Sequence, residues 1–289
     1  IRDSPRYWRW LYEIEAEIRE NIPILFYHIW DDLPDPKYNR DYYESCDWLG
    51  CISRQTYGIV SRVGNIDSET IKPLEDWQVD YVPHGINPKK CFKTEVPADF
   101  KKAALGEKDY KFVLFWMNRN IRRKQPGDVA LAYKYFMDEL TPEQRDECVL
   151  IYHCTPIDDN GTDLPRLMRH LMPDYDVCFT HHLRGKDGGF EDGEMNLVFN
   201  SADVYINLAS NEGFGLGSAE ALTVGTPIIV NVTGGLQDQC GFTNGDGDFL
   251  TPDDYVDLGS NHLGTYKEHG EWVFPVFPSN RSLQGSPPT

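Results

Sequence analysis

The 289-residue sequence has no long hydrophobic run. Its most apolar stretches, residues 112–117 and 227–232, have the length of buried strands and are too short to cross a bilayer. The N-terminus also lacks the charged-then-apolar pattern of a signal peptide. We therefore expect a cytoplasmic protein without a transmembrane segment.

Positive charge is scarce, since 28 Lys and Arg stand against 46 Asp and Glu, for a net charge of −18. A chain of this charge repels phosphate backbones, so we expect no nucleic-acid partner. One dense basic cluster stands out: Arg119, Arg122, Arg123 and Lys124. It is too small for a nucleic-acid face but well sized for a diphosphate.

Cysteine has no metal-site or disulfide pattern, because the seven residues are odd in number and show no repeated CxxC spacing. Cys148, Cys154 and Cys178 lie in or beside apolar runs, where a reduced thiol acts as a small hydrophobic group. The pairs His181-His182 and Asp158-Asp159 likewise lack the fixed spacing of a ligand set. We expect no metal site.

What the sequence does contain is an alternation of short apolar strands and amphipathic helices. Strands are predicted at residues 24–30, 48–53, 78–82, 111–117, 149–155, 175–181, 204–208 and 227–232. Helices are predicted at residues 127–140, 163–172, 194–200 and 217–224. Near-continuous apolar strands that alternate with helices indicate an α/β fold whose parallel sheets are covered on both faces.

The alternation is interrupted by a polar stretch, and we place a linker at about residues 86–108. The sequence thus predicts two domains, at residues 1–90 and 91–289. The segment from residue 275 is rich in Pro, Ser and Gly, and we expect an extended tail there.

The most informative segment is residues 211–220, which follows the predicted strand 204–208. Two glycines and Glu212 come at the carboxyl end of this strand, and Glu220 lies one turn into the next helix. Glycines let a phosphate approach the backbone, and the helix start supplies free amides. A carboxylate such as Glu220 can accept hydrogen bonds from a ribose. The alternative is a plain strand-to-helix turn with both glutamates in solvent.

The wider pattern resembles the signature of glycosyltransferase family 4, the retaining GT-B enzymes. The matching residues are Glu212, Gly213, Phe214, Gly215, Leu216, Glu220, Ala221, Leu222, Gly225, Pro227, Ile228 and Ile229. Further segments follow in the family's order: Arg119 with Lys124 five residues on, Gly234-Gly235-Leu236, Val82-Pro83-His84-Gly85-Ile86, the strand ending at His28, and Cys51-Ile52-Ser53. The resemblance spans roughly residues 22 to 252.

The resemblance implies two Rossmann-like domains and assigns roles to individual residues. Glu212, Arg119, Lys124 and His28 are implied as catalytic residues: Glu212 and His28 beside the transferred sugar, and the basic pair on the donor diphosphate. The implied donor-binding residues are Gly213, Phe214, Gly215, Leu216, Glu220, Gly234 and Gly235. Because the basic pair replaces the cation of other glycosyltransferases, no metal or other cofactor is implied. Arg122 or Arg123 could take the place of either basic residue.

Two departures concern single positions: Asn118 replaces the family's Gly before Arg119, and Ser210-Asn211 replaces Pro-Ser. The family's opening strand also has no counterpart before Ile24, and its C-terminal crossing helix has none after Thr289. We therefore expect an incomplete N-terminal domain and a chain shortened at both ends.

The predicted function is transfer of a sugar from a UDP- or GDP-sugar to an unidentified acceptor (a glycan, lipid or small molecule), with retention of configuration. A catalytically silent nucleotide-sugar-binding module is the first alternative. A GT-B enzyme of another reaction type, such as a phosphorylase or an epimerase, is the second.

Overall fold

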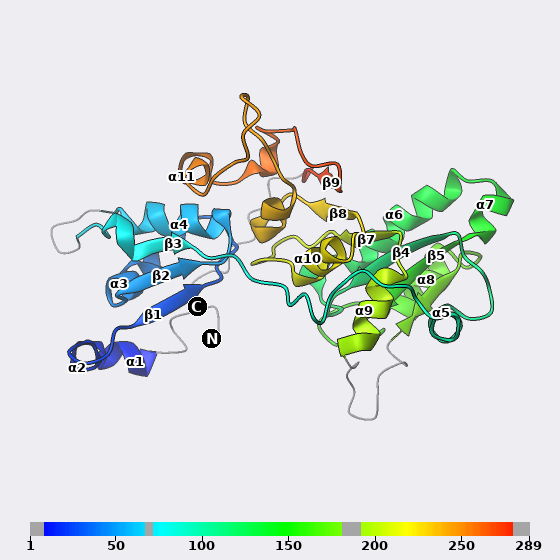
Figure 1. Cartoon of the computed structure of the whole chain (residues 1–289), viewed down its shortest axis with the longest axis horizontal. Helices are drawn as coiled ribbons and strands as arrows, with labels where there is room; N and C mark the ends of the chain where they lie inside the picture. The colour runs from blue at the N-terminus through cyan, green and yellow to red at the C-terminus, as the bar shows by residue number, and fades with distance from the viewer. Residues whose placement is uncertain (1–8, 67–71, 181–191, 280–289) are drawn as a thin grey trace.

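Three short apolar runs near the N-terminus form a parallel sheet in the order β1-β2-β3 (Figure 1). They are β1 (Leu25–His28), β2 (Trp48–Cys51) and β3 (Val79–Tyr81). The computed structural model describes residues 9–66, 72–180 and 192–279. Four helices accompany this sheet: α1 (Arg9–Glu13), α2 (Glu15–Arg19), α3 (Arg40–Glu44) and α4 (Arg54–Gly64). Helix α4 begins after Ser53, whose hydroxyl accepts a hydrogen bond from the amide of Thr56 at 3.1 Å.

A second, larger parallel sheet follows in the order β6-β5-β4-β7-β8-β9. Its strands are β4 (Phe112–Met117), β5 (Cys148–His153), β6 (Val177–Phe179), β7 (Val204–Asn207), β8 (Ile228–Asn231) and β9 (Val273–Val276). From β4 the chain adds β5 and β6 on one side, and it then returns to add β7, β8 and β9 on the other side, so β4 and β7 are neighbours. This is the doubly wound order, in which the carboxyl ends of β4 and β7 mark the topological switch point where ligands bind.

Both faces of the larger sheet are buried, as predicted. Val113 and Phe115 of β4 belong to one core cluster with residues of α9 (Asp192–Asn200) and α10 (Leu216–Thr223). Leu114 and Trp116 belong to the other, with α6 (Pro126–Asp138) and α8 (Leu164–Leu171). The period of two along a strand sends successive side chains to opposite faces, so an unbroken apolar strand needs a cover on each side. The seven cysteines are thiols, and six of them are buried.

The eight predicted strands and four predicted helices are confirmed, with ends shifted by at most two residues; residue 181 lies outside the described residues. The expected tail from residue 275 is wrong at its start, because β9 runs through Pro275 to Val276. That strand is at the sheet edge, where the missing amide of a proline costs no ladder bond. The predicted linker contains a helix, α5 (Ala98–Leu105). The division into residues 1–90 and 91–289 stays a prediction, with one sheet on each side of it.

The two sheets are joined through α4, which contacts η6 (Gly234–Gln239) and α11 (Asp254–Leu258). Helix α11 is seen above α4 in Figure 1. The buried carboxylate of Asp238 accepts hydrogen bonds from the Arg54 amide at 2.9 Å and from the Tyr81 hydroxyl at 3.0 Å. Arg62 donates to the carbonyl of Tyr255 at 3.0 Å. The remaining elements are α7 (Pro142–Asp146), η2 (Lys37–Asn39), η3 (Asp76–Gln78), η4 (Arg122–Lys124) and η7 (Asn261–Leu263). None of the helices in the described ranges is both long and apolar enough to span a membrane.

Candidate functional site

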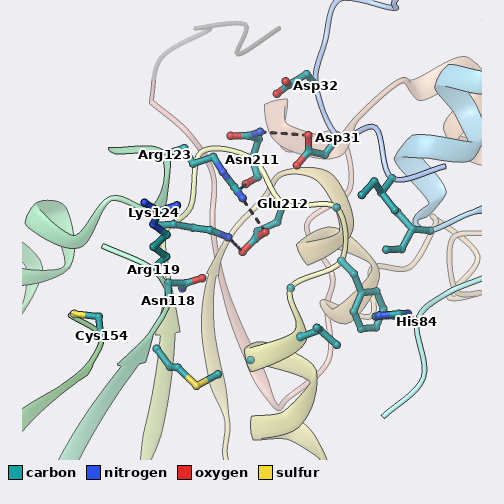
Figure 2. A pocket seen from close by; sticks show the side chains of 18 of the residues that line it. Asp31, Asp32, His84, Asn118, Arg119, Arg123, Lys124, Cys154, Asn211 and Glu212 are labelled. Atoms are coloured by element: carbon teal, nitrogen blue, oxygen red, sulfur yellow. Dashed lines mark hydrogen bonds and ion pairs between the residues drawn. The ribbon is translucent and has the colours of Figure 1, made fainter. Parts of the chain in front are cut away.

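A cavity of about 1040 Å³ opens between the two sheets (Figure 2). One wall comes from the carboxyl ends of β4 and β5 and from the loop after β7, which is the predicted switch-point position. The other wall comes mainly from the segment that follows β1. Of the residues implied by the resemblance, Arg119, Lys124, Glu212, Gly213, Phe214, Gly215 and Leu216 line the cavity.

Lys124 and Glu212 form the centre of the larger wall. Lys124 is 7% exposed and Glu212 9% exposed, and the Lys124 Nζ pairs with Glu212 Oε1. Arg123 approaches the other carboxylate oxygen at 3.5 Å and donates to the Asn211 carbonyl at 2.8 Å. Burial lowers the pKa of Lys124, and the Glu212 carboxylate opposes that shift. Figure 2 shows both cations converging on Glu212.

Arg119 stands at the rim of the cavity with a 65% exposed side chain. Its Nε pairs with Asp158 Oδ2 at 3.0 Å, an interaction that raises the pKa of Arg119 and lowers that of Asp158. Of the two arginines that the sequence left as alternatives, Arg123 lines the cavity and Arg122 does not. The cavity therefore carries three cations at the carboxyl end of β4.

Helix α10 points its N-terminus at the same cavity. Gly215 precedes the helix with φ +87°, a left-handed conformation that other residues rarely adopt. Gly215, Leu216 and Gly217 line the cavity, so the unpaired amides and the positive dipole end of α10 face it. An anion bound here would meet helix amides as well as side-chain cations.

The glycine pair Gly234-Gly235 lies behind Glu212 rather than on the cavity surface. The Gly235 amide donates to the Glu212 carbonyl at 2.8 Å, and a Cβ on Gly234 would lie 2.0 Å from that carbonyl oxygen. Gly234 has φ +47°, and its amide donates to Gln55 Oε1 at 3.1 Å. The pair thus fixes the backbone that carries Glu212.

Glu220 lies in the second turn of α10, half-buried, and it is absent from the residues that line the cavity in the described chain. Burial raises the pKa of its carboxyl group. Its predicted contact with a ribose stays a prediction.

The structure does not bring His28 to the cavity. His28 is fully buried, and its Nε2 lies 2.6 Å from the Tyr43 hydroxyl of α3. The alternation along β1 explains the difference, because Tyr27 faces the cavity and its neighbour His28 faces the opposite side of the sheet. Burial lowers the pKa of His28 to about 3, so its imidazole is neutral at pH 7.

Asp31 and Asp32 were not predicted from the sequence; they follow β1 after Ile29 and Trp30, and both line the cavity. Asp31 Oδ1 accepts a hydrogen bond from Asn211 Nδ2 at 3.2 Å, which links the two walls (Figure 2). Burial raises the pKa of Asp31 to about 6, while Asn211 and Arg123 oppose the shift. The signal was available, because acidic residues at the carboxyl end of a predicted strand are placed like Glu212.

Asn118, the residue in place of the family's glycine, also lines the cavity. Its Nδ2 is buried and has no hydrogen-bond partner among the described residues. A buried amide donor of this kind favours an acceptor atom from a ligand. Within the described ranges, no three His, Cys, Asp or Glu residues gather into a metal-binding group.

The chain is similar in sequence to glycosyltransferases. The family model of glycosyl transferases group 1 matches residues 188–253. The alpha-monoglucosyldiacylglycerol synthase of Acholeplasma laidlawii is 25% identical over 197 residues, which make up 67% of this chain and 44% of that protein.

Two solved structures show the same fold. Alr3699/HepE of Anabaena, solved in complex with UDP and glucose, has a TM-score of 0.56 at 15% identity, covering 86% of this chain and 64% of that one. Sucrose-phosphate synthase of Thermosynechococcus elongatus has a TM-score of 0.55 at 18% identity, covering 86% of this chain and 65% of that one. The predicted resemblance and the GT-B fold class are confirmed. The chain spans less than half the length of the curated relative and about two thirds of these two structures.

Proposed function

We propose that the cavity binds a nucleotide-diphosphate sugar and that the chain transfers the sugar to an acceptor hydroxyl with retention of configuration. In this reaction the bond from the anomeric carbon to the β-phosphate oxygen breaks, and the acceptor oxygen forms the new bond on the same face. The acceptor proton leaves with the nucleoside diphosphate. The reaction needs only the donor and the acceptor, with no oxidant or third reactant.

The observation that carries the proposal is the convergence of Arg119, Arg123 and Lys124 with the N-terminus of α10 on one cavity. Negative charge grows on the leaving diphosphate as the glycosidic bond breaks, and fixed cations and amides at that position stabilise it. Arginine suits forked contacts with phosphate oxygens, and lysine acts as a point charge. These groups supply the charge that a metal ion provides elsewhere, so the proposed reaction needs no metal.

Glu212 is proposed to accept hydrogen bonds from hydroxyls of the transferred sugar. Its pairing with Lys124 and Arg123 holds the carboxylate beside the diphosphate position. The complex of HepE with UDP and glucose supports a UDP-sugar as the donor class for a chain of this fold.

A catalytically silent nucleotide-sugar-binding module is the second candidate. One observation favours it: His28 is fully buried against Tyr43 and does not line the cavity. Both candidate functions include binding of the donor, so only a measurement of turnover distinguishes the enzyme from the silent module.

The test is to incubate the chain with UDP-, GDP- and ADP-glucose and a panel of acceptors, and to follow release of nucleoside diphosphate and formation of glycoside. Stereochemistry of the product is read by NMR at the new anomeric centre. We expect release of nucleoside diphosphate. From a donor with an axial glycosidic bond, we expect a product whose new glycosidic bond is also axial. Donor binding by calorimetry without any release would establish the silent module, and inversion would refute the retaining mechanism.

A further inference from the structure

We propose that the acceptor is an uncharged polyhydroxyl compound, such as a sugar without a phosphate group, and that Asp31 binds the acceptor hydroxyls. This inference rests on the proposed function and narrows it to one acceptor class.

The cavity is electrically asymmetric. The wall before residue 90 consists of Tyr27, Ile29, Trp30, Asp31, Asp32, Ile52 and His84. In the described chain this wall contributes two carboxylates and no lysine or arginine to the cavity, whereas all three cations stand on the opposite wall. Figure 2 shows the aspartates and the basic side chains on separate segments. A sugar acceptor that approaches from the first wall therefore meets carboxylate oxygens, which accept hydrogen bonds, and aromatic rings.

A phosphorylated acceptor fits this wall poorly. A phosphate group brings a charge of about −1.5 to −2 at pH 7. Beside Asp31 and Asp32 it would meet like charges in a partly desolvated site, where their repulsion is strong. The three cations lie on the opposite wall, where Lys124 and Arg123 pair with Glu212 and Arg119 pairs with Asp158. The donor diphosphate requires the same three groups.

Asp31 is held where an acceptor hydroxyl would need it. Its backbone carbonyl accepts a hydrogen bond from Gln55 Nε2 at 2.9 Å, and its Oδ1 accepts one from Asn211 Nδ2 at 3.2 Å. Asn211 is the residue before Glu212, so the Asp31 carboxylate faces the proposed sugar position across the cavity. A carboxylate accepts hydrogen bonds from hydroxyl groups and repels anions, which is the selectivity proposed here.

The aromatic residues of the cavity fit a carbohydrate. Trp30 donates its indole N–H to the Asp32 carbonyl at 2.9 Å, which fixes the ring. At the far end of the cavity His84 meets Phe214 edge to face, with ring centroids 5.8 Å apart, and stacks on Tyr27 at 6.2 Å. Rings with an apolar face and a polar rim suit a sugar, which also presents C–H faces and hydroxyl edges.

The test compares matched acceptors and matched variants of the whole chain. The donor is the nucleotide-glucose that binds in calorimetry. The acceptors are glucose, maltose, mannose and glycerol, each beside its phosphorylated counterpart. We measure kcat and KM for acceptor-dependent release of nucleoside diphosphate, and separately the release in water without acceptor. Asp31→Asn tests the carboxylate with nearly the same shape, and Asp41→Asn removes one charge from the exposed face of α3 as a control.

We expect neutral acceptors to stimulate release and their phosphorylated counterparts to do so at least tenfold less efficiently. Asp31→Asn should raise the KM for the neutral acceptor by roughly tenfold to a hundredfold, since a charge-assisted hydrogen bond is lost. Asp41→Asn should match the native chain in donor affinity, in release in water and in the KM for the acceptor. A preference for phosphorylated acceptors, no stimulation by any neutral acceptor, or an unchanged KM in Asp31→Asn would overturn the inference. Failure of donor binding would instead refute the proposed function.

Discussion

Variants of the ion pair between Lys124 and Glu212 should change the free energy of unfolding and the affinity for the donor diphosphate independently. Both residues are buried, 7% and 9% exposed. Replacing Lys124 by Ala leaves the Glu212 carboxylate in a desolvated site with only Arg123, at 3.5 Å. Breaking a buried pair from one side costs about 3–5 kcal/mol, and the surviving Arg123 contact places the expected loss near the lower figure, about 3 kcal/mol.

The double variant Lys124→Ala/Glu212→Gln removes the unpaired charge together with the lysine. We expect it to recover most of the lost free energy of unfolding, to within about 1 kcal/mol of the native chain, because a neutral amide is far easier to bury than a carboxylate. Urea denaturation of the native chain, both single variants and the double variant gives the coupling energy of the pair.

Affinity for the nucleoside diphosphate should depend on whether Lys124 is present, whatever residue stands at position 212. Loss of a charge-assisted contact with phosphate weakens binding by about 1.5–3 kcal/mol, or roughly tenfold to 150-fold in Kd, in both variants that lack Lys124. Glu212→Gln should bind at least as tightly as the native chain, since it removes an anion that competes for Lys124. Arg122→Ala is the charge-matched control, because Arg122 lies outside the cavity lining, and it should change neither quantity appreciably. Native diphosphate affinity in the stable double variant would refute the assignment of Lys124.

Three further predictions concern the scaffold. Gly234→Ala should destabilise the fold by about 2–4 kcal/mol, because the new Cβ would lie 2.0 Å from the Glu212 carbonyl oxygen and because residue 234 has φ +47°. Gly85→Ala, which has open space around its Cβ, is the control in the same denaturation assay. Burial raises the pKa of Asp238 to about 6, above its value in the unfolded chain, so the native state takes up this proton at a higher pH than the unfolded chain does. The Asp238 contribution to the free energy of unfolding should therefore rise by about 2 kcal/mol as pH falls from 7 to 4. Asp238→Asn should abolish this rise, and the same pH profile in the variant and the native chain would refute the prediction. The buried, neutral His28 should show no titration between pH 5 and 8 when its imidazole resonances, assigned with His28→Gln, are followed by NMR.

The larger sheet was predictable because its strands are buried on both faces and read as unbroken apolar runs. Strand β5, for instance, has five consecutive buried residues from Cys148 to Tyr152. Strand β9 escaped prediction because it contains Pro275 and lies at the sheet edge, where Phe274 is exposed. Helix α11, with five residues, packs against α4, so tertiary contacts stabilise it more than its own sequence pattern does.

The candidate site was predictable on the wall where the motif is continuous in sequence. Residues 211–217 surround the cavity, and Arg119 and Lys124 join them because β4 and β7 are neighbours. The opposite wall was harder to predict. Which face of β1 looks into the cavity depends on a single-residue register, and that register selects Tyr27 over His28. The role of Asp31 likewise depends on a hydrogen bond to Asn211, 180 residues away in sequence.

Three cations and the start of α10 are proposed to form a diphosphate site, and a calorimetric comparison with nucleosides tests this site. The native chain is titrated with UDP, GDP and ADP and with the corresponding nucleosides, at two salt concentrations. We predict that at least one diphosphate binds a hundredfold or more tightly than its nucleoside, and that this advantage shrinks as salt rises, because the contacts are ionic. Equal affinity of nucleoside and diphosphate, or an advantage that salt leaves unchanged, would contradict the claim.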